Sequence, residues 1–215
     1  MYSYRELRPS NICSDRFKHL LLLLYWPLYG IMFYSVERLI TFDSYHSMYH
    51  PLDDIVPFCE WFLFPYLFWF VFMVGMLVYT AFWDIQSFKK YMWFIIITYT
   101  VTIVIYLLFP NQQELRVLSP ERSNALIDFI QWYYSFDTNT NVCPSLHVIG
   151  SVAVLYASWN SRHFKKWAWR ILMTVMTVLI SISTVFLKQH SVLDIPAALI
   201  VSAAAIPLSS FIAKK

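Results

Sequence analysis

Two short segments of the chain hold the residue types that could do chemistry. His147 closes the sequence Pro144-Ser145-Leu146-His147, and His190 is followed four residues later by Asp194. A carboxylate beside an imidazole accepts one ring N–H, fixes the tautomer and stabilises the imidazolium. The other ring nitrogen of His190 is then free to attack phosphorus, while a second histidine protonates the leaving group. The two segments therefore indicate phosphoryl transfer through a phosphohistidine.

The composition places these residues in a membrane protein. Of 215 residues, 59% are hydrophobic and only 13% are charged, whereas a soluble domain has about 25% charged residues. A membrane-spanning helix needs about 20 mostly apolar residues, and six segments qualify or come close. They are residues 20–36, 61–83, 91–110, 146–159, 171–187 and 195–213. We therefore predict an all-α integral membrane protein, a six-helix bundle forming one multi-pass domain over residues 1–215.

The basic residues divide unequally between the two sides that six spans define. The side of the termini holds twelve and the other side holds four. The twelve are Arg5, Arg8, Arg16, Lys18, Lys89, Lys90, Arg162, Lys165, Lys166, Arg170, Lys214 and Lys215, and the four are Arg38, Arg116, Arg122 and Lys188. Because cytoplasmic loops carry the excess of basic residues, we predict a plasma-membrane protein with both termini cytoplasmic and both histidine segments extracytoplasmic. The first apolar run is longer than a signal-peptide core and lacks a cleavage site, so we expect it to stay as an anchor.

The predicted helix start at Pro144-Ser145 offers a place for phosphate. The first backbone N–H groups of a helix have no partner within it, and the helix dipole puts partial positive charge there. A plainer interpretation makes His147 an ordinary histidine at a wet helix end and Asp194 a cap for the last helix. Polar groups at membrane boundaries are functional by default, so we favour a site.

We predict a further, short helix in the loop that precedes this helix start. Ser119-Pro120-Glu121 is typical of a helix N-terminus, with serine as the cap. Apolar and aromatic residues then recur at helical spacing up to Tyr134, and the polar residues 137–141 favour a turn that ends the helix. We predict a short amphipathic helix at the membrane interface, between the third and fourth spans.

The motifs resemble those of the type 2 phosphatidic acid phosphatase family. Pro144-Ser145-Leu146-His147 is similar to its P-S-x-H motif, and His190 with Asp194 is similar to its final H-x-x-x-D motif. The resemblance implies that His190 is the nucleophile, that Asp194 orients it and that His147 protonates the leaving group. It also implies that Arg116 and Ser145 bind phosphate. The active-site loops would then be residues 110–147 and 184–196.

The chain departs from the family pattern at three positions. Phe109 stands where the first motif has lysine, Val117 follows Arg116 in place of proline, and Thr184 replaces an arginine six residues before the final histidine. The segment around Lys188 is closer in style to the inositol phosphorylceramide synthase-like branch. Residues 184 and 188 share a face if the fifth span continues through Lys188, so we predict that Lys188 supplies the missing phosphate contact.

These observations lead to a function with alternatives. We predict a lipid phosphatase that hydrolyses a lipid phosphate or pyrophosphate at the outer face and needs no metal or other cofactor. One alternative is a phosphotransferase that moves a phospho-head-group to an alcohol acceptor, and another is a non-catalytic binding or transport protein. Expected partners are the lipid phosphate and membrane lipids; nucleic acid is excluded because the basic residues form no continuous groove.

Two other groups of residues received a weaker interpretation. His46, His50, Asp53 and Asp54 lie close together in the first outer loop and resemble a metal-ligand cluster, but Pro51 interrupts the pattern. We predict a solvated loop there. Cys59 and Cys143 both fall near the outer face, and their spacing leaves open whether they pair.

Overall fold

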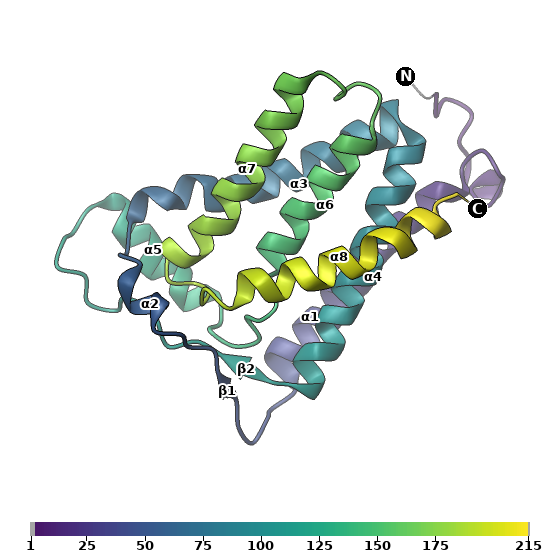
Figure 1. Cartoon of the computed structure of the whole chain (residues 1–215). Helices are drawn as coiled ribbons and strands as arrows, with labels where there is room; N and C mark the ends of the chain where they lie inside the picture. Colours follow the sequence, from purple (N-terminus) through teal and green to yellow (C-terminus); the bar gives the residue numbers. More distant parts are fainter. Residues whose placement is uncertain (1–2, 215) are drawn as a thin grey trace.

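The helix at the centre of the structure, α6 (Leu146–Asn160), is shorter than each of the four helices that pack around it. The structure is a computed structural model that describes residues 3–214. Four longer helices pack around α6, as Figure 1 shows. They are α3 (Leu63–Trp83), α4 (Ile85–Leu108), α7 (Trp167–Phe186) and α8 (Asp194–Ile212). Small residues such as Ala153 and Ala157, both fully buried, let these neighbours approach α6 closely.

Five helical segments of the described chain are long and apolar enough to cross a membrane. They are Lys18–Leu39, Glu60–Trp83, Ile85–Leu108, Trp167–Phe186 and Asp194–Ile212, and each overlaps one predicted span. The first consists of three consecutive pieces: η2 (Lys18–Leu24), α1 (Tyr25–Tyr34) and η3 (Ser35–Leu39). The remaining predicted span corresponds to α6, whose 15 residues rise only about 22 Å at 1.5 Å per residue. The all-helical fold is confirmed, but the count of six spans is not.

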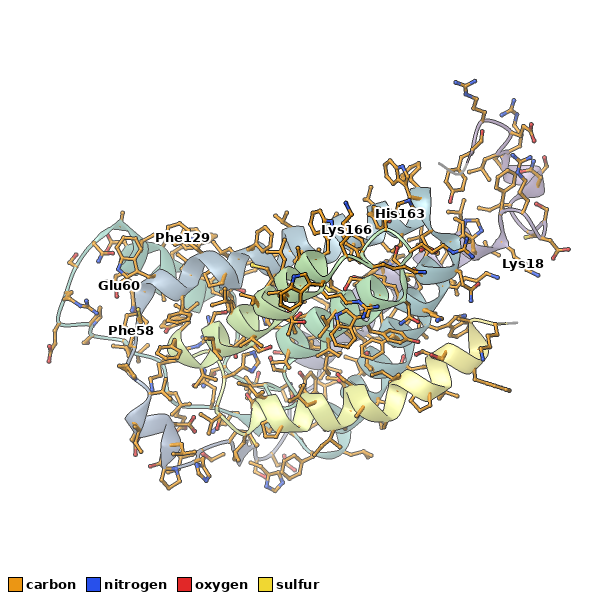
Figure 2. All side chains as sticks on the ribbon, turned by 45° about the horizontal axis from the view of Figure 1, so that its top comes forward. Lys18, Phe58, Glu60, Phe129, His163 and Lys166 are labelled. Carbon is orange, nitrogen blue, oxygen red and sulfur yellow. The ribbon has the colours of Figure 1, made fainter. Side chains whose placement is uncertain are left out.

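The segments that connect α1 to α3, α4 to α6 and α7 to α8 lie at the end of the bundle opposite the two termini (Figure 1). They contain β1 (His46–Ser47), α2 (Leu52–Ile55), η4 (Glu60–Phe62), β2 (Asn111–Gln112) and α5 (Ala125–Phe136). Strands β1 and β2 pair in parallel with His46 opposite Asn111. In Figure 2, Glu60 and Phe129 mark this end, and Lys18 lies toward the other. The other short helix, η1 (Pro9–Asn11), belongs to the N-terminal segment.

Helix α5 differs from its prediction at the start and agrees at the end. Ser119 is not the cap, because the helix begins only at Ala125. Asn124 is the cap, and its Oδ1 accepts the N–H groups of Leu126 and Ile127, both at 3.0 Å. The helix ends at Phe136, before the predicted turn. Its contact with a membrane surface stays a prediction.

Candidate active site

His190 lies in the turn between α7 and α8, and two hydrogen bonds hold its ring. Nδ1 lies 2.8 Å from Asp194 Oδ2 and donates to it, because a carboxylate only accepts. Nε2 lies 3.3 Å from the hydroxyl oxygen of Ser145. Asp194 is completely buried. This arrangement fixes the proton on Nδ1 and leaves the lone pair on Nε2, the atom that a nucleophilic role requires.

The backbone that presents His190 is a helix C-terminus and not a continuing helix. Helix α7 ends at Phe186, so the condition under which residues 184 and 188 would share a helical face is not met. Lys188 has a φ of 54°, its N–H donates to Val185 O at 3.0 Å and the Gln189 N–H donates to Thr184 O at 3.0 Å. These two bonds and the left-handed residue form a Schellman motif. The motif turns the chain back so that His190 meets the start of α6.

Helix α6 starts where the sequence predicts. Ser145 is its N-cap, but the serine side chain makes no capping hydrogen bond. Its hydroxyl instead points to His190. The first N–H groups of α6 have no partner within the helix, so they remain available to an anion placed beside His190.

His147 lies in the first turn of α6 and is held by aromatic packing. Its ring stacks on Tyr66 at 4.2 Å between centroids and lies 4.5 Å from the Trp69 ring. The His147 and His190 rings are 5.9 Å apart. Within residues 3–214, Nε2 of His147 is buried and has no hydrogen-bond partner. A buried ring nitrogen of this kind is suited to exchange a proton with a bound substrate.

Gly150, one turn further along α6, makes this packing possible. A Cβ atom at this position would lie 2.7 Å from Trp69 Nε1 and 2.8 Å from Met73 Sδ. Glycine therefore lets α3 approach α6 closely enough for Trp69 to reach the ring of His147.

Arg116 belongs to the loop before α5, and its guanidinium lies at the C-terminal end of that helix, next to the turn that carries His190. Its guanidinium donates to the backbone oxygens of Tyr134, Asp137 and Thr138 at 2.7–3.0 Å. It also donates to Gln189 Oε1 at 2.8 Å. Its Nε is buried and has no hydrogen-bond partner within residues 3–214. Arg116 therefore ties α5 to the residue before His190.

Lys188 is a predicted phosphate-binding residue whose ammonium the structure directs away from the two histidines. Its ammonium donates to the backbone oxygens of Asp53 and Val56, both at 2.5 Å. It therefore joins the His190 turn to the loop between α1 and α3. Both Lys188 and Arg116 are absent from the described lining of the cavity beside the histidines.

A cavity of about 260 Å³ opens between the two histidines and the loop before α6. Aromatic side chains form much of its wall, including Trp69, Tyr106 and Tyr133. Asp137 also faces it; burial raises the pKa of this carboxyl, and Arg116 limits the rise. None of the lining residues, all within residues 3–214, is a lysine or arginine. The cavity can hold a phosphate ester, with charge stabilisation from N–H groups more than from side-chain cations.

Several residues that position the site were not predicted from the sequence. Asn111 is completely buried, and its side chain bonds the backbone of Val142 and Cys143 at 2.8–2.9 Å, which fixes the approach to α6. Asp53 is buried and bonds Ser191, so the prediction of a solvated loop is wrong for this residue. The only available signal for Asn111 was an asparagine directly after Pro110, at the end of an apolar run. Nothing in the spacing distinguishes Asp53 from Asp54.

Neither metal ligation nor a disulfide is seen in the described part of the chain. Residues 3–214 contain no group of three or more His, Cys, Asp or Glu side chains able to hold a metal ion. Cys59 and Cys143 are free thiols.

Fold and site together define a helical membrane protein with two histidines and an aspartate at a cavity near one end of the bundle. A family model described as the PAP2 superfamily matches residues 31–208, which include all of these residues. The chain therefore belongs to the PAP2 superfamily. This membership supports phosphatase-type activity on a phosphorylated substrate. Searches of curated proteins and of solved structures found no match.

Proposed function

We propose that this protein is a membrane lipid phosphatase that cleaves a lipid phosphate or pyrophosphate through a phosphohistidine at His190. One observation carries the proposal: Asp194 holds Nδ1 of His190, so that Nε2 faces the helix start of α6. His147 lines the same cavity. A nucleophile and a proton donor thus share one space with unpaired N–H groups.

The first half of the reaction transfers the phosphoryl group to the protein. Nε2 of His190 attacks phosphorus, the bond from phosphorus to the lipid oxygen breaks, and His147 gives its proton to that oxygen. Ser145 and the first N–H groups of α6 stabilise the charge on the transferring oxygens.

The second half frees the protein. His147 now accepts a proton from water, the resulting hydroxide attacks phosphorus, and the phosphorus–nitrogen bond of the phosphohistidine breaks. Inorganic phosphate leaves, and both histidines return to their starting protonation states. The chemistry of the step requires only groups that the site already holds.

A second candidate function, phosphotransfer to an alcohol, is favoured by the lack of cations in the cavity. A phosphodiester carries one negative charge, whereas a phosphomonoester near pH 7 carries between one and two (about −1.5 to −2). The cavity lining described above has the Asp137 carboxyl and no lysine or arginine, so a monoanionic diester is the easier ligand to bring in. An alcohol would then replace water in the second half-reaction.

An assay on purified, detergent-solubilised protein separates these possibilities. A panel of lipid phosphates, lipid pyrophosphates and phosphodiester lipids is offered with and without alcohol acceptors, and both free phosphate and transferred head group are measured. Phosphate release that His190→Ala abolishes supports the phosphatase, and acceptor-dependent transfer supports the second candidate. If no lipid is turned over, the protein is a binding or transport member of its superfamily.

We further propose that the site faces outward from a plasma membrane, with both termini in the cytoplasm. The excess of basic residues on the side of the termini supports this orientation. Ser123 and Lys165 are exposed at the two ends. In a protein without native cysteines, Ser123→Cys should react with an impermeant thiol reagent on intact cells, and Lys165→Cys should react only after lysis. The reverse pattern would place the chemistry in the cytoplasm.

A further inference from the structure

The first outer loop and the turn that carries His190 are joined by a buried carboxylate. Asp53, in α2, is only 1% exposed. Its Oδ2 accepts from the Ser191 hydroxyl at 2.7 Å and its Oδ1 accepts from the Val192 N–H at 2.7 Å. The same Oδ2 accepts the N–H of His50 at 2.8 Å, which anchors the carboxylate to its own loop. Both carboxylate oxygens are therefore committed to holding these two segments together.

A cation makes the reverse connection. Lys188 is nearly buried, and its ammonium donates to the backbone oxygens of Asp53 and Val56. Burial lowers the pKa of this ammonium, and the charges of Asp53 and Asp54 limit the fall. The lysine and the aspartate thus clasp each other's segments, and each compensates the charge of the other.

The contacts of Asp53 and Lys188, together called the clasp, surround the residue of the turn whose backbone is strained, which is Lys188 itself. Lys188 has a left-handed φ of 54°, a conformation that glycine adopts readily and lysine does not. Such a conformation persists only where surrounding contacts hold it. The contacts on its outer side come from Asp53 and Val56, and Asp194 holds the inner side by accepting the Ser191 N–H at 3.2 Å.

We propose that Asp53 is a positioning residue for the nucleophile His190. It contacts the residues on both sides of the histidine and does not line the cavity, so it acts through the turn and not on the substrate. The proposal rests on the proposed function, because it assigns Asp53 to the reaction of His190. The first outer loop, though distant in sequence from both histidine segments, is then part of the catalytic apparatus.

The test compares Asp53→Ala with Asp54→Ala. Asp54 is the matched control, because it belongs to the same short helix, is exposed and bonds Tyr49 in its own loop. We expect Asp53→Ala to lower kcat per folded molecule about 10²-fold, the effect of a misplaced reacting group, with KM nearly unchanged. Asp54→Ala should stay within about twofold of the wild type. Asp53→Asn, which keeps an acceptor but loses the charge, should fall between them.

Hydrogen–deuterium exchange supplies a readout that does not depend on activity. In Asp53→Ala, peptides covering residues 188–194 should exchange faster than in the wild type, while α4 and α6 stay protected. A general loss of protection, or kcat and exchange equal to those of Asp54→Ala, would overturn the proposal. If Asp53→Ala does not fold, Ser191→Ala removes one of the same bonds and must show the same local exchange and a smaller fall in kcat.

Lipid turnover by the wild type separates the failure of this proposal from the failure of the proposed function. If no lipid is turned over by the wild type, the proposed function fails, and with it the catalytic meaning of the clasp. If the wild type is active and Asp53→Ala matches Asp54→Ala, only the positioning role fails.

Discussion

The two histidines of the site are held in opposite ways. His190 is fixed by the hydrogen bond that its Nδ1–H donates to Asp194 and by a second one with Ser145, on a turn that departs from helical geometry. His147 lies on a regular helix, and aromatic stacking fixes its ring while Nε2 has no bond in the described chain. A nucleophile needs one tautomer and one direction of attack, whereas a general acid needs a nitrogen that gains and loses a proton. The hydrogen bonds of His190 and the aromatic stacking of His147 therefore suit the role proposed for each ring.

The largest effect should come from the hydrogen-bonded histidine. His190→Ala removes the nucleophile, so we expect kcat to fall by more than about 10³-fold on every substrate, as for other nucleophile deletions. The protein should remain monodisperse in detergent, since the substitution removes only the hydrogen bonds and the ring contact that His190 makes within the site. Steady-state assays with lipid and aryl phosphates measure the fall. Retained turnover on either substrate would contradict the nucleophile role of His190, and with it the difference in role between the two rings.

Asp194→Asn tests whether the support of His190 matters in itself. An amide can donate to Nδ1 and thereby favour the wrong tautomer, with the proton on Nε2. We expect a loss of about 10²–10⁴-fold in kcat, the upper value being known for such an exchange in a catalytic triad. The loss should be equal on substrates with good and poor leaving groups, because tautomer and orientation serve the attack. A loss confined to poor leaving groups would assign Asp194 to proton donation instead.

His147→Ala should separate the roles of the two rings. Without a general acid, a lipid alkoxide leaves poorly, and we expect a fall of about 10²–10⁴-fold on lipid substrates. An activated aryl phosphate needs little protonation, so its loss should be much smaller. The ratio of the two kcat/KM values is the measurement, with His190→Ala as the comparison that should show no such ratio. Equal losses on both substrates would argue against the acid role.

The smallest effect should come from the packing that supports His147. Gly150→Ala puts a methyl group against Trp69 and Met73, and overpacking of this kind costs about 1–3 kcal/mol. We expect a lower Tm and a displaced His147 ring, with lipid turnover reduced about tenfold or less and aryl phosphate turnover nearly unchanged. Ala153→Gly, elsewhere on α6, controls for general loosening of the helix. A larger loss on the aryl substrate would separate this packing from the acid.

The chemistry-bearing residues and the helical class could be predicted from the sequence. Helix entrances have clear signals, so Ser145 as the start of α6 is confirmed, and the spacing of His190 and Asp194 is that of a bonded pair. The two residues meet across a turn and the first turn of α8, because α7 ends before Lys188.

What could not be predicted are contacts between segments far apart in the chain. Nothing local distinguishes Asp53, which is buried against Ser191, from Asp54, which is exposed. Lys188 has the charge to bind phosphate, but its left-handed backbone directs the ammonium to the loop between α1 and α3. Apolar length also misled for α6, since a helix surrounded by other helices need not be long enough to cross the membrane by itself.

The central claim, that His190 is the nucleophile, is tested most directly by trapping the phosphorylated protein. Purified protein is mixed with substrate for milliseconds to seconds, quenched in alkali to preserve phosphohistidine, and mapped by mass spectrometry. The account predicts a phosphoryl group on His190, absent from His190→Ala and formed from aryl phosphate by His147→Ala, in which its hydrolysis should be slowed. Phosphate on another residue, or turnover by His190→Ala at the wild-type rate, would contradict it.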